Sequence, residues 1–443
     1  MKRNFIKILL CTAAIGLVAS CKKDDDINKE IIGLGGDTWE KGPIDEWLLQ
    51  NFTLPYNIDV KYRWDGAELA VDRTLVPVKE EKVIPLMETV RDAWIKVYTD
   101  EIGETFIKKL APKQYVLVGS PQYNSGGTIT LGEAEGGRKV TLFRVNDFSK
   151  SNRDIVKPIL KTIHHEFGHI LHQNVMYAPE YQLVTPTGYT SDWNNISVAN
   201  ARAAGYISAY AQSGPSEDFV EMIAIMLTEG KAGYETIIKG ITNAAAVTAL
   251  RKKEEIVVSY FKQKWNIEFY RLQNRTTKAI SSVTSVVPLS TYLGFGKTYT
   301  SLAINPGLPD LSADFVSIFN TAKAGLAALS NNAGRQFDNF TFFFNANDEM
   351  VMRVYYRNAA GSAFEANFTY KMTVDANQNL KFVFVSADAN ANTAGPGIVA
   401  LTNYLTQNTF KLDWYYSQDM KSEYGGLTKV GDPASYISGV LTF

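Results

Sequence analysis

One short stretch constrains this chain more than any other, because it holds every histidine in the 443 residues. The stretch Asp154–His172 reads DIVKPILKTIHHEFGHILH. A polar cap at Ser151 or Asp154, with Pro158 in the early turns where proline is tolerated, favours a helix. Apolar residues recur at helical spacing, at Ile155, Ile159, Ile163, Phe167 and Ile170. The stretch is therefore predicted to be one helix that carries all four imidazoles.

Within this helix, His165, Glu166 and His169 form the pattern H-E-x-x-H. Positions four apart share one helix face about 6 Å apart along the axis, so two imidazoles can bind one metal ion with Glu166 beside them. This is the arrangement for a zinc-bound water with a carboxylate general base. The alternative, a core helix with incidental histidines, does not explain why all four cluster. Gly168 costs a helix about 1 kcal/mol relative to alanine, which predicts a close backbone approach on that side.

The other two histidines are expected to have different roles. His172 lies about 10 Å along the axis from His165, too far for one ion to bind both in an unbroken helix. It is expected to orient a ligand or to serve the helix end. His164 is rotated by about 100° from His165 and is expected to pack against neighbours.

A catalytic zinc needs a third protein ligand, and no histidine remains to supply it. The stretch Ser216–Leu227 reads SEDFVEMIAIML and predicts a second helix, capped by Ser216. Glu217 and Glu221 are four apart on one face of that helix, so Glu217 can bind the metal while Glu221 holds a ligand histidine through its other ring nitrogen. The alternative is that acidic residues in a first turn only complement the helix dipole, which is the simplest interpretation of Asp218.

HEFGH at 165–169, followed about fifty residues later by EDFVE at 217–221, resembles the gluzincin metallopeptidases, in which the third zinc ligand is a glutamate. LVGS at 117–120, LGEAEGGRKV at 131–140, HHEFGHILHQ at 164–173 and EDFVEMIA at 217–224 are similar, more narrowly, to zinc-binding metallopeptidase lipoproteins found beside bacterial polysaccharide-uptake systems. The resemblance covers roughly residues 39–280. It implies one zinc ion on His165, His169 and Glu217, with Glu166 as the general base.

The resemblance also implies an oxyanion group and a substrate cleft. Lethal-factor-like gluzincins carry a tyrosine seven residues before the glutamate ligand, and Tyr210 has that spacing here. Tyr206 competes for the role, and either tyrosine is also compatible with plain core packing. The cleft is expected beside Gly126–Ala134, where an edge strand would pair with extended substrate.

The N-terminal residues predict export and lipidation. A basic start and a short apolar run end at Val18-Ala19-Ser20-Cys21, which resembles a bacterial lipobox. Residues 1–20 are therefore expected to be a lipoprotein signal peptide, Cys21 the lipidated residue, and 21–38 a tether to the outer membrane. The acidic run after Cys21 resembles a surface-export signal, although a solvated tether is equally compatible. Cys11, the only other cysteine, would be removed with the signal.

The remaining sequence predicts an α+β protein with two domains. Residues 39–280 are expected to form a zincin-like metallopeptidase domain, and 281–443 a mainly antiparallel β domain. In the second domain, Asn/Asp/Gly turns separate six predicted strands from one another, and helices are expected near 313–329 and 397–407. The strands are expected at 341–344, 350–356, 366–374, 380–386, 409–416 and 436–441. In the first, 128–131 and 139–145 are expected to form a hairpin.

The formal net charge is -1, or about -4 once Lys2, Arg3 and Lys7 are removed, so no basic surface favours nucleic acid as a partner. The sequence predicts a zinc metallopeptidase that acts on a protein, peptide or glycoprotein at the cell surface, with polysaccharide-uptake components as neighbours. The alternative is a catalytically silent surface lipoprotein that captures glycan or protein. In that case Trp414, Tyr415 and Tyr416 would be candidates to stack on sugars.

Overall fold

The structure of the chain is a computed structural model. It describes residues 40–443 except 70–71, 124–128, 131, 136–137, 309 and 331–332. The signal peptide, Cys21, the tether and part of the expected cleft at Gly126–Ala134 therefore lie outside the described residues. The chain divides into two compact units, 1–45 and 46–443. In the first unit, residues 43–45 begin helix α2 (Pro43–Leu48).

A small four-stranded sheet lies before the histidine helix in the sequence. Its strands, in spatial order, are β1 (Asp59–Lys61), β2 (Gln114–Leu117), β6 (Lys139–Leu142) and β5 (Gly132–Glu135). The first three are parallel, and β5 runs antiparallel to β6 at the edge. A separate ribbon pairs β3 (Gln122–Tyr123) with β4 (Ile129–Thr130).

The expected hairpin between 128–131 and 139–145 is wrong in its pairing. Residues 129–130 pair with β3, and β6 pairs with Gly132–Glu135, which the sequence suggested was a turn. Strand β5 lies very close to the histidine helix, because a Cβ atom at Gly132 would lie 2.0 Å from Cγ2 of Thr162. Glycine at this position therefore permits the close approach of strand and helix.

Helices build the rest of the region up to residue 283. The long ones are α7 (Arg153–Asn174), α9 (Pro215–Lys239), α10 (Ala244–Trp265) and α11 (Phe269–Val283). The shorter elements include α4 (Glu80–Val90), α5 (Lys96–Ile102), α6 (Glu104–Leu110) and α8 (Val198–Ala203). Between α4 and α5 the π-helical turn η2 (Arg91–Ile95) supplies Trp94, whose ring packs edge-on to Phe167 of α7 at 5.3 Å between centroids. Aromatic packing of this kind fixes α7 against the preceding helices.

Helix α9 is bent at Gly230, where φ is +68°. A residue with a side chain is strained at such a φ, and a Cβ atom here would also lie 2.6 Å from Oγ1 of Thr277. The bend separates the half of α9 that carries Glu217 and Glu221 from the half that ends at Lys239.

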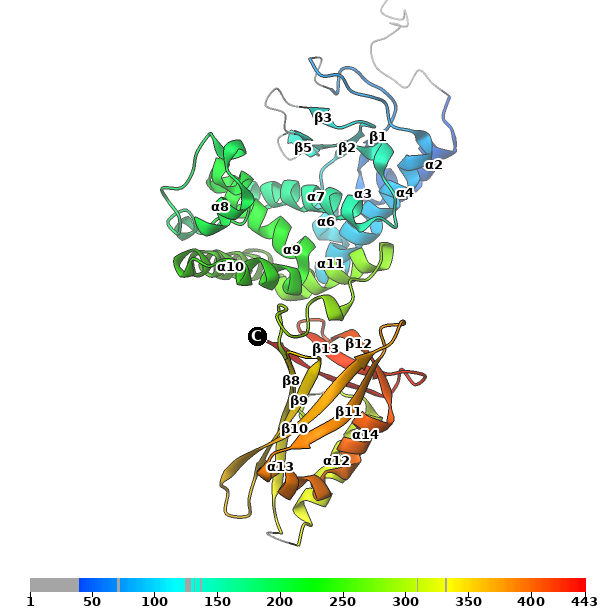
Figure 1. Cartoon of the computed structure of the whole chain (residues 1–443). Coiled ribbons are helices and arrows are strands. Elements are labelled where there is room, and N and C mark those ends of the chain that lie inside the picture. The colour runs from blue at the N-terminus through cyan, green and yellow to red at the C-terminus, as the bar shows by residue number, and fades with distance from the viewer. Residues whose placement is uncertain are drawn as a thin grey trace, which may run out of the picture. The chain divides into compact units, whose positions relative to one another are not determined.

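Residues 301–442 contain a closed eight-stranded antiparallel barrel (Figure 1). Its strands are β7 (Ser301–Ile304), β8 (Gln336–Asn345), β9 (Glu349–Arg357), β10 (Ala363–Val374), β11 (Leu380–Ala387), β12 (Thr409–Tyr416), β13 (Glu423–Lys429) and β14 (Tyr436–Thr442). Helices α12 (Ala313–Ala327), α13 (Ala389–Ala394) and α14 (Val399–Gln407) accompany it. Phe319 of α12 packs on Phe337 of β8 with ring centroids 4.7 Å apart, so the helix belongs to the barrel core.

The α+β fold class expected from the sequence is confirmed. The strands predicted in this region are present, and α12 and α14 lie where helices were expected. The sequence did not predict β7, β13 or closure into a barrel. None of the helices in the described part of the chain is long and apolar enough to cross a membrane.

Candidate metal centre

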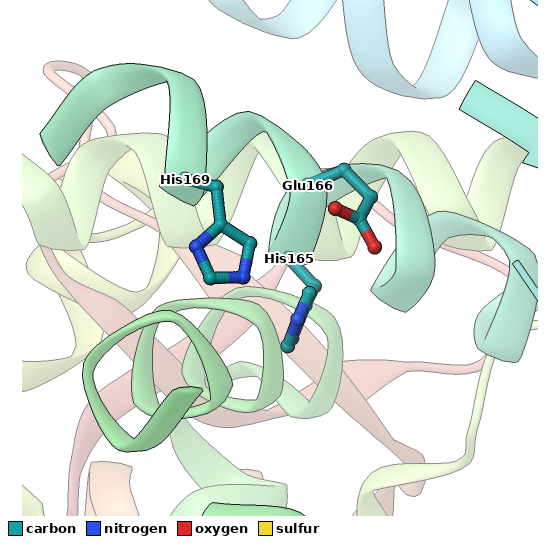
Figure 2. A group of neighbouring side chains, drawn as sticks. All are labelled: His165, Glu166 and His169. Atoms are coloured by element: carbon teal, nitrogen blue, oxygen red, sulfur yellow. The ribbon is translucent and has the colours of Figure 1, made fainter. Parts of the chain in front are cut away.

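Helix α7 presents His165 and His169 from one side. Its N-cap is Asn152, whose side chain accepts a hydrogen bond from the backbone N–H of Asp154, and not Ser151 or Asp154 as expected. The two imidazole rings have centroids 5.0 Å apart, and Glu166 projects beside them (Figure 2). The predicted close approach at Gly168 is confirmed, since a Cβ atom there would lie 3.0 Å from Cγ1 of Val220 on α9.

The packing of α9 on α7 brings Glu217 to both histidines. Oε2 of Glu217 lies 3.1 Å from Nε2 of His165 and 3.2 Å from Nε2 of His169. Atoms bound to a tetrahedral zinc ion at about 2.0–2.1 Å are about 3.3 Å from one another. Both distances from Oε2 of Glu217 are close to that spacing.

Glu166 is the other carboxylate at the site. One oxygen of Glu166 and one ring nitrogen from each of His165 and His169 all lie within 4.8 Å of one another. Glu217 approaches both Nε2 atoms from α9, whereas Glu166 projects from α7 beside the two imidazoles (Figure 2). Two imidazole nitrogens and one carboxylate oxygen are a donor set that suits zinc and leaves one position for water, so these residues fit the ion.

Glu221 holds His165 from behind. Its Oε1 lies 2.9 Å from Nδ1 of His165, so Nε2 of the same ring is directed at Glu217. Lys161 donates to Glu221 at 2.8 Å, and the hydroxyl of Ser208 donates to it at 2.6 Å. The buried carboxylate of Glu221 thus accepts hydrogen bonds from His165, Lys161 and Ser208, which hold it in one orientation. The carboxylate in turn fixes the orientation of the His165 ring.

The pKa values at the site reflect these contacts. Burial lowers the pKa of His165, but its hydrogen bonds to Glu217 and Glu221 outweigh burial and raise the pKa to about 9. Burial raises the pKa of Glu217, yet the hydrogen bonds to the two histidines hold it far below its usual range. Burial also raises the pKa of Glu221, but the contacts with Lys161 and His165 outweigh burial and lower the pKa to about 2. Both carboxylates are therefore ionised at neutral pH, which supplies negative charge for a divalent cation.

His172 contacts the second histidine of the motif. Its Nε2 lies 3.0 Å from Nδ1 of His169, and its ring packs against Tyr177 and Phe219. Burial lowers the pKa of His172 to about 4, so the imidazole is neutral at neutral pH. Of the two roles expected for it, this contact corresponds to orienting a ligand.

His164 points elsewhere. It is fully buried, its Nδ1 lies 3.2 Å from the hydroxyl of Tyr98, and burial lowers its pKa to about 3. This is the packing position expected from the sequence.

Of the two candidate tyrosines, Tyr210 is the one beside the histidines. Its ring stacks on His165 with centroids 5.7 Å apart, and Trp193 packs edge-on against its ring. Burial and the nearby Glu217 carboxylate raise the pKa of Tyr210, so its hydroxyl keeps its proton. Tyr206 is fully buried, and its hydroxyl donates to the carbonyl of Thr185 at 2.5 Å.

A buried ion pair that the sequence did not reveal lies next to the site. Asp218 and Lys253 are both fully buried, with Nζ and Oδ2 2.6 Å apart, so Asp218 has an ion-pair partner in addition to its place in the first turn of α9. Lys253 also donates to the carbonyl of Gly205 and lies 4.0 Å from the centre of the Tyr206 ring. Burial raises the pKa of Asp218 to about 6 and lowers that of Lys253, which expresses the cost of enclosing both charges.

The aromatic residues of the barrel that were considered for sugar binding are engaged within the protein. Trp414 donates through Nε1 to the carbonyl of Val287, and Tyr415 stacks on Tyr436 at 4.5 Å between ring centroids. Tyr416 is half-buried beside Glu423, and burial raises its pKa. All three are partly exposed and line a cavity, so sugar stacking stays a prediction.

A family model and one solved structure are similar to this chain. Residues 37–270, just over half of the chain, match the family model described as "Putative zinc-binding metallo-peptidase". A crystal structure of a "putative zinc-binding metallo-peptidase from Bacteroides caccae ATCC 43185" is 33% identical, with 54% of this chain and 92% of that chain covered and a TM-score of 0.48. No curated protein was found to match. The chain therefore belongs to the zinc-binding metallopeptidase family that this model describes.

Proposed function

We propose that this chain hydrolyses peptide bonds as a gluzincin-type peptidase with His165, His169 and Glu217 as its zinc ligands. The observation that carries the proposal is the approach of both Nε2 atoms to one oxygen of Glu217, at 3.1 and 3.2 Å. The family to which the chain belongs supports the peptidase class.

Zinc, when bound, would polarise the substrate carbonyl and lower the pKa of a water molecule toward 7. Glu166 accepts the proton of the attacking water and returns a proton to the leaving amine. The hydroxyl of Tyr210, which keeps its proton, donates a hydrogen bond to the carbonyl oxygen as negative charge develops there. Glu221 and His172 keep the ligand imidazoles oriented while the proton moves.

The substitution Glu166→Gln tests this assignment. We expect the variant to keep its zinc and to lose hydrolysis by about 10²–10⁴-fold, because the proton acceptor is removed while the three ligands remain. Zinc-loaded protein would be assayed on a library of fluorescence-quenched peptides, with the exposed Glu180→Gln as the matched control. Full activity in Glu166→Gln would refute the base assignment. A zinc-loaded wild type that cleaves no peptide would favour the alternative of a silent binding lipoprotein.

We further infer that the mature protein is an outer-membrane lipoprotein that begins at Cys21. The support is the lipobox-like Val18–Cys21 at the end of a basic and apolar leader. Peptides, proteins or glycoproteins at the cell surface would then be its substrates, near polysaccharide-uptake components. Cys21→Ala should release the protein from the membrane fraction, and unchanged fractionation would contradict the inference.

A further inference from the structure

The barrel closes between β11 and β12 through only two residue pairs, so one edge of β12 is open over most of its length. Strand β12 pairs with β13 along its length from Phe410 to Tyr416, but with β11 only at Thr409 and Phe410. In the described part of the chain, no backbone hydrogen bond joins residues 411–416 to any segment other than β13. One side of the strand therefore presents backbone groups without a neighbouring strand.

The ladder with β13 shows which groups these are. The backbone N–H of Val430 donates to the carbonyl of Thr409 at 2.8 Å, and the N–H of Ser417 donates to that of Ser422 at 2.9 Å. These bonds flank the pairs Phe410–Lys429 and Tyr416–Glu423, which are therefore non-hydrogen-bonded pairs of the antiparallel ladder. Pairs alternate along the strand, so Lys411, Asp413 and Tyr415 bond to β13. The N–H and C=O groups of the residues between them, Leu412, Trp414 and Tyr416, are directed to the open edge.

The open edge borders a groove. A cavity of about 680 Å³ includes Lys411–Asp413 in its lining, and a second cavity of about 480 Å³ includes Leu412–Tyr416. The two share Val286, Pro288, Leu412 and Asp413, so they adjoin along β12.

The larger cavity has an apolar base and walls on more than one side. Its lining includes the buried side chains of Leu293, Phe344 and Leu380. The loop at 286–297 supplies one wall, where Val286 and Phe295 are 57% and 65% exposed. The turns at 345–348 and 374–378 supply others. Exposed apolar side chains beside unpaired backbone groups are typical of a binding groove.

We propose that this groove binds an extended polypeptide segment, which adds as a strand to the edge of β12. Unpaired N–H and C=O groups are matched by the backbone of an extended chain, and alternate side chains of that chain would enter the cavities. Because loops and turns flank the edge, a single extended segment fits better than the sheet edge of a second folded copy. Recognition through the backbone makes the site tolerant of sequence, with a preference for apolar side chains. This proposal does not depend on the proposed peptidase activity.

Hydrogen exchange at single residues tests the pairing directly. The full mature chain would carry Glu166→Gln, so that a bound polypeptide is not cleaved, and the probe would be reduced, carboxymethylated α-lactalbumin. We expect the amides of Leu412, Trp414 and Tyr416 to exchange rapidly in the free protein and at least tenfold more slowly with the probe. The amides of Lys411, Asp413 and Tyr415 should be protected in both states. Native α-lactalbumin, which is folded, should produce no protection.

A matched pair of substitutions tests whether the polypeptide binds in this groove. Val286→Arg puts a long charged side chain into the groove from an exposed position, and it should weaken probe binding at least tenfold. Val399→Arg, at an exposed position on α14 that lines neither cavity, should leave binding unchanged. The proposal is overturned if the three edge amides are already protected in the free protein, or if Val286→Arg binds the probe like wild type. Protection that instead follows protein concentration, with a doubled mass in light scattering, would assign the edge to a second copy and also overturn it.

Discussion

The two histidines that we propose as zinc ligands are oriented by chemically different groups. His165 contacts the buried carboxylate of Glu221, which Lys161 and Ser208 hold in turn. His169 contacts the neutral imidazole of His172. When a metal ion binds Nε2 of His169, Nδ1 of the same ring donates a hydrogen bond to Nε2 of His172. Both contacts would then favour the tautomer that carries its hydrogen on Nδ1.

His172→Leu tests this arrangement at the scale of one residue. Removal of the acceptor should weaken zinc binding by about 10–100-fold, because His169 loses the partner that fixes its ring and tautomer. His172→Gln, which offers a carbonyl oxygen as acceptor, should restore part of the affinity. Competition with a chelator of known affinity measures both variants. Wild-type affinity in His172→Leu would show that the contact has no part in binding.

At the scale of residues, spacing in the sequence was enough to predict which side chains lie together when both are on one helix. The pairs His165–His169 and Glu217–Glu221 could be predicted because positions four apart share a helix face. The contacts of Ser208 and Lys253 could not be predicted, nor could the sequence decide between Tyr210 and Tyr206. Each depends on how the segment 175–214 folds back on α9 and α10. Lys161 lies one turn before His165, a spacing that could have identified it.

At the scale of elements, the segment between α7 and α9 is fixed by charge as well as by packing. Lys253 of α10 reaches Asp218 of α9 and the carbonyl of Gly205, while the hydroxyl of Tyr189 donates to Asp218 at 3.1 Å. This buried cluster holds the segment that carries Tyr210 close to the histidines. The stability of the region should therefore depend on it.

Lys253→Met is expected to lower the free energy of unfolding by about 3–5 kcal/mol, because it removes the charge partner of buried Asp218, which must then carry an uncompensated charge or take up a proton. Lys252→Met is the matched control. The Lys252–Glu255 pair is exposed, and its loss should cost at most about 1 kcal/mol. Adding Asp218→Asn to Lys253→Met should recover part of the loss. Urea unfolding measures all three variants, and equal effects of Lys253→Met and Lys252→Met would contradict the importance of the buried pair.

The elements themselves were predicted unevenly. Long periodic segments such as α7 were found, because an apolar stripe identifies a helix. The hairpin near β6 was assigned the wrong partner, since a glycine-rich segment was interpreted as a turn. Gly132 serves instead to let β5 approach Thr162.

At the scale of the whole molecule, closure of the barrel depends on pairs far apart in sequence. Strand β7 pairs with β14, where Ala303 lies opposite Val440. Strand β13 contains Gly425 and Gly426, where a Cβ atom would lie 2.7 Å from Cδ2 of Leu441 and 2.4 Å from the carbonyl oxygen of Ile437, respectively. Glycines required by such packing weaken the strand pattern, so a sequence-based prediction fails at this point. The sequence could identify the β-rich class of the region but not its closure.

The most direct test of the central claim is the zinc content of purified residues 22–443 by mass spectrometry. Wild type, Glu217→Ala and the exposed control Glu180→Ala would be compared after dialysis against zinc at neutral pH. We predict one zinc ion per chain in wild type and in Glu180→Ala, and its loss in Glu217→Ala, because the carboxylate that meets both imidazoles is removed. A wild type that takes up no zinc, or a Glu217→Ala variant that keeps it with unchanged affinity, would contradict the proposed site.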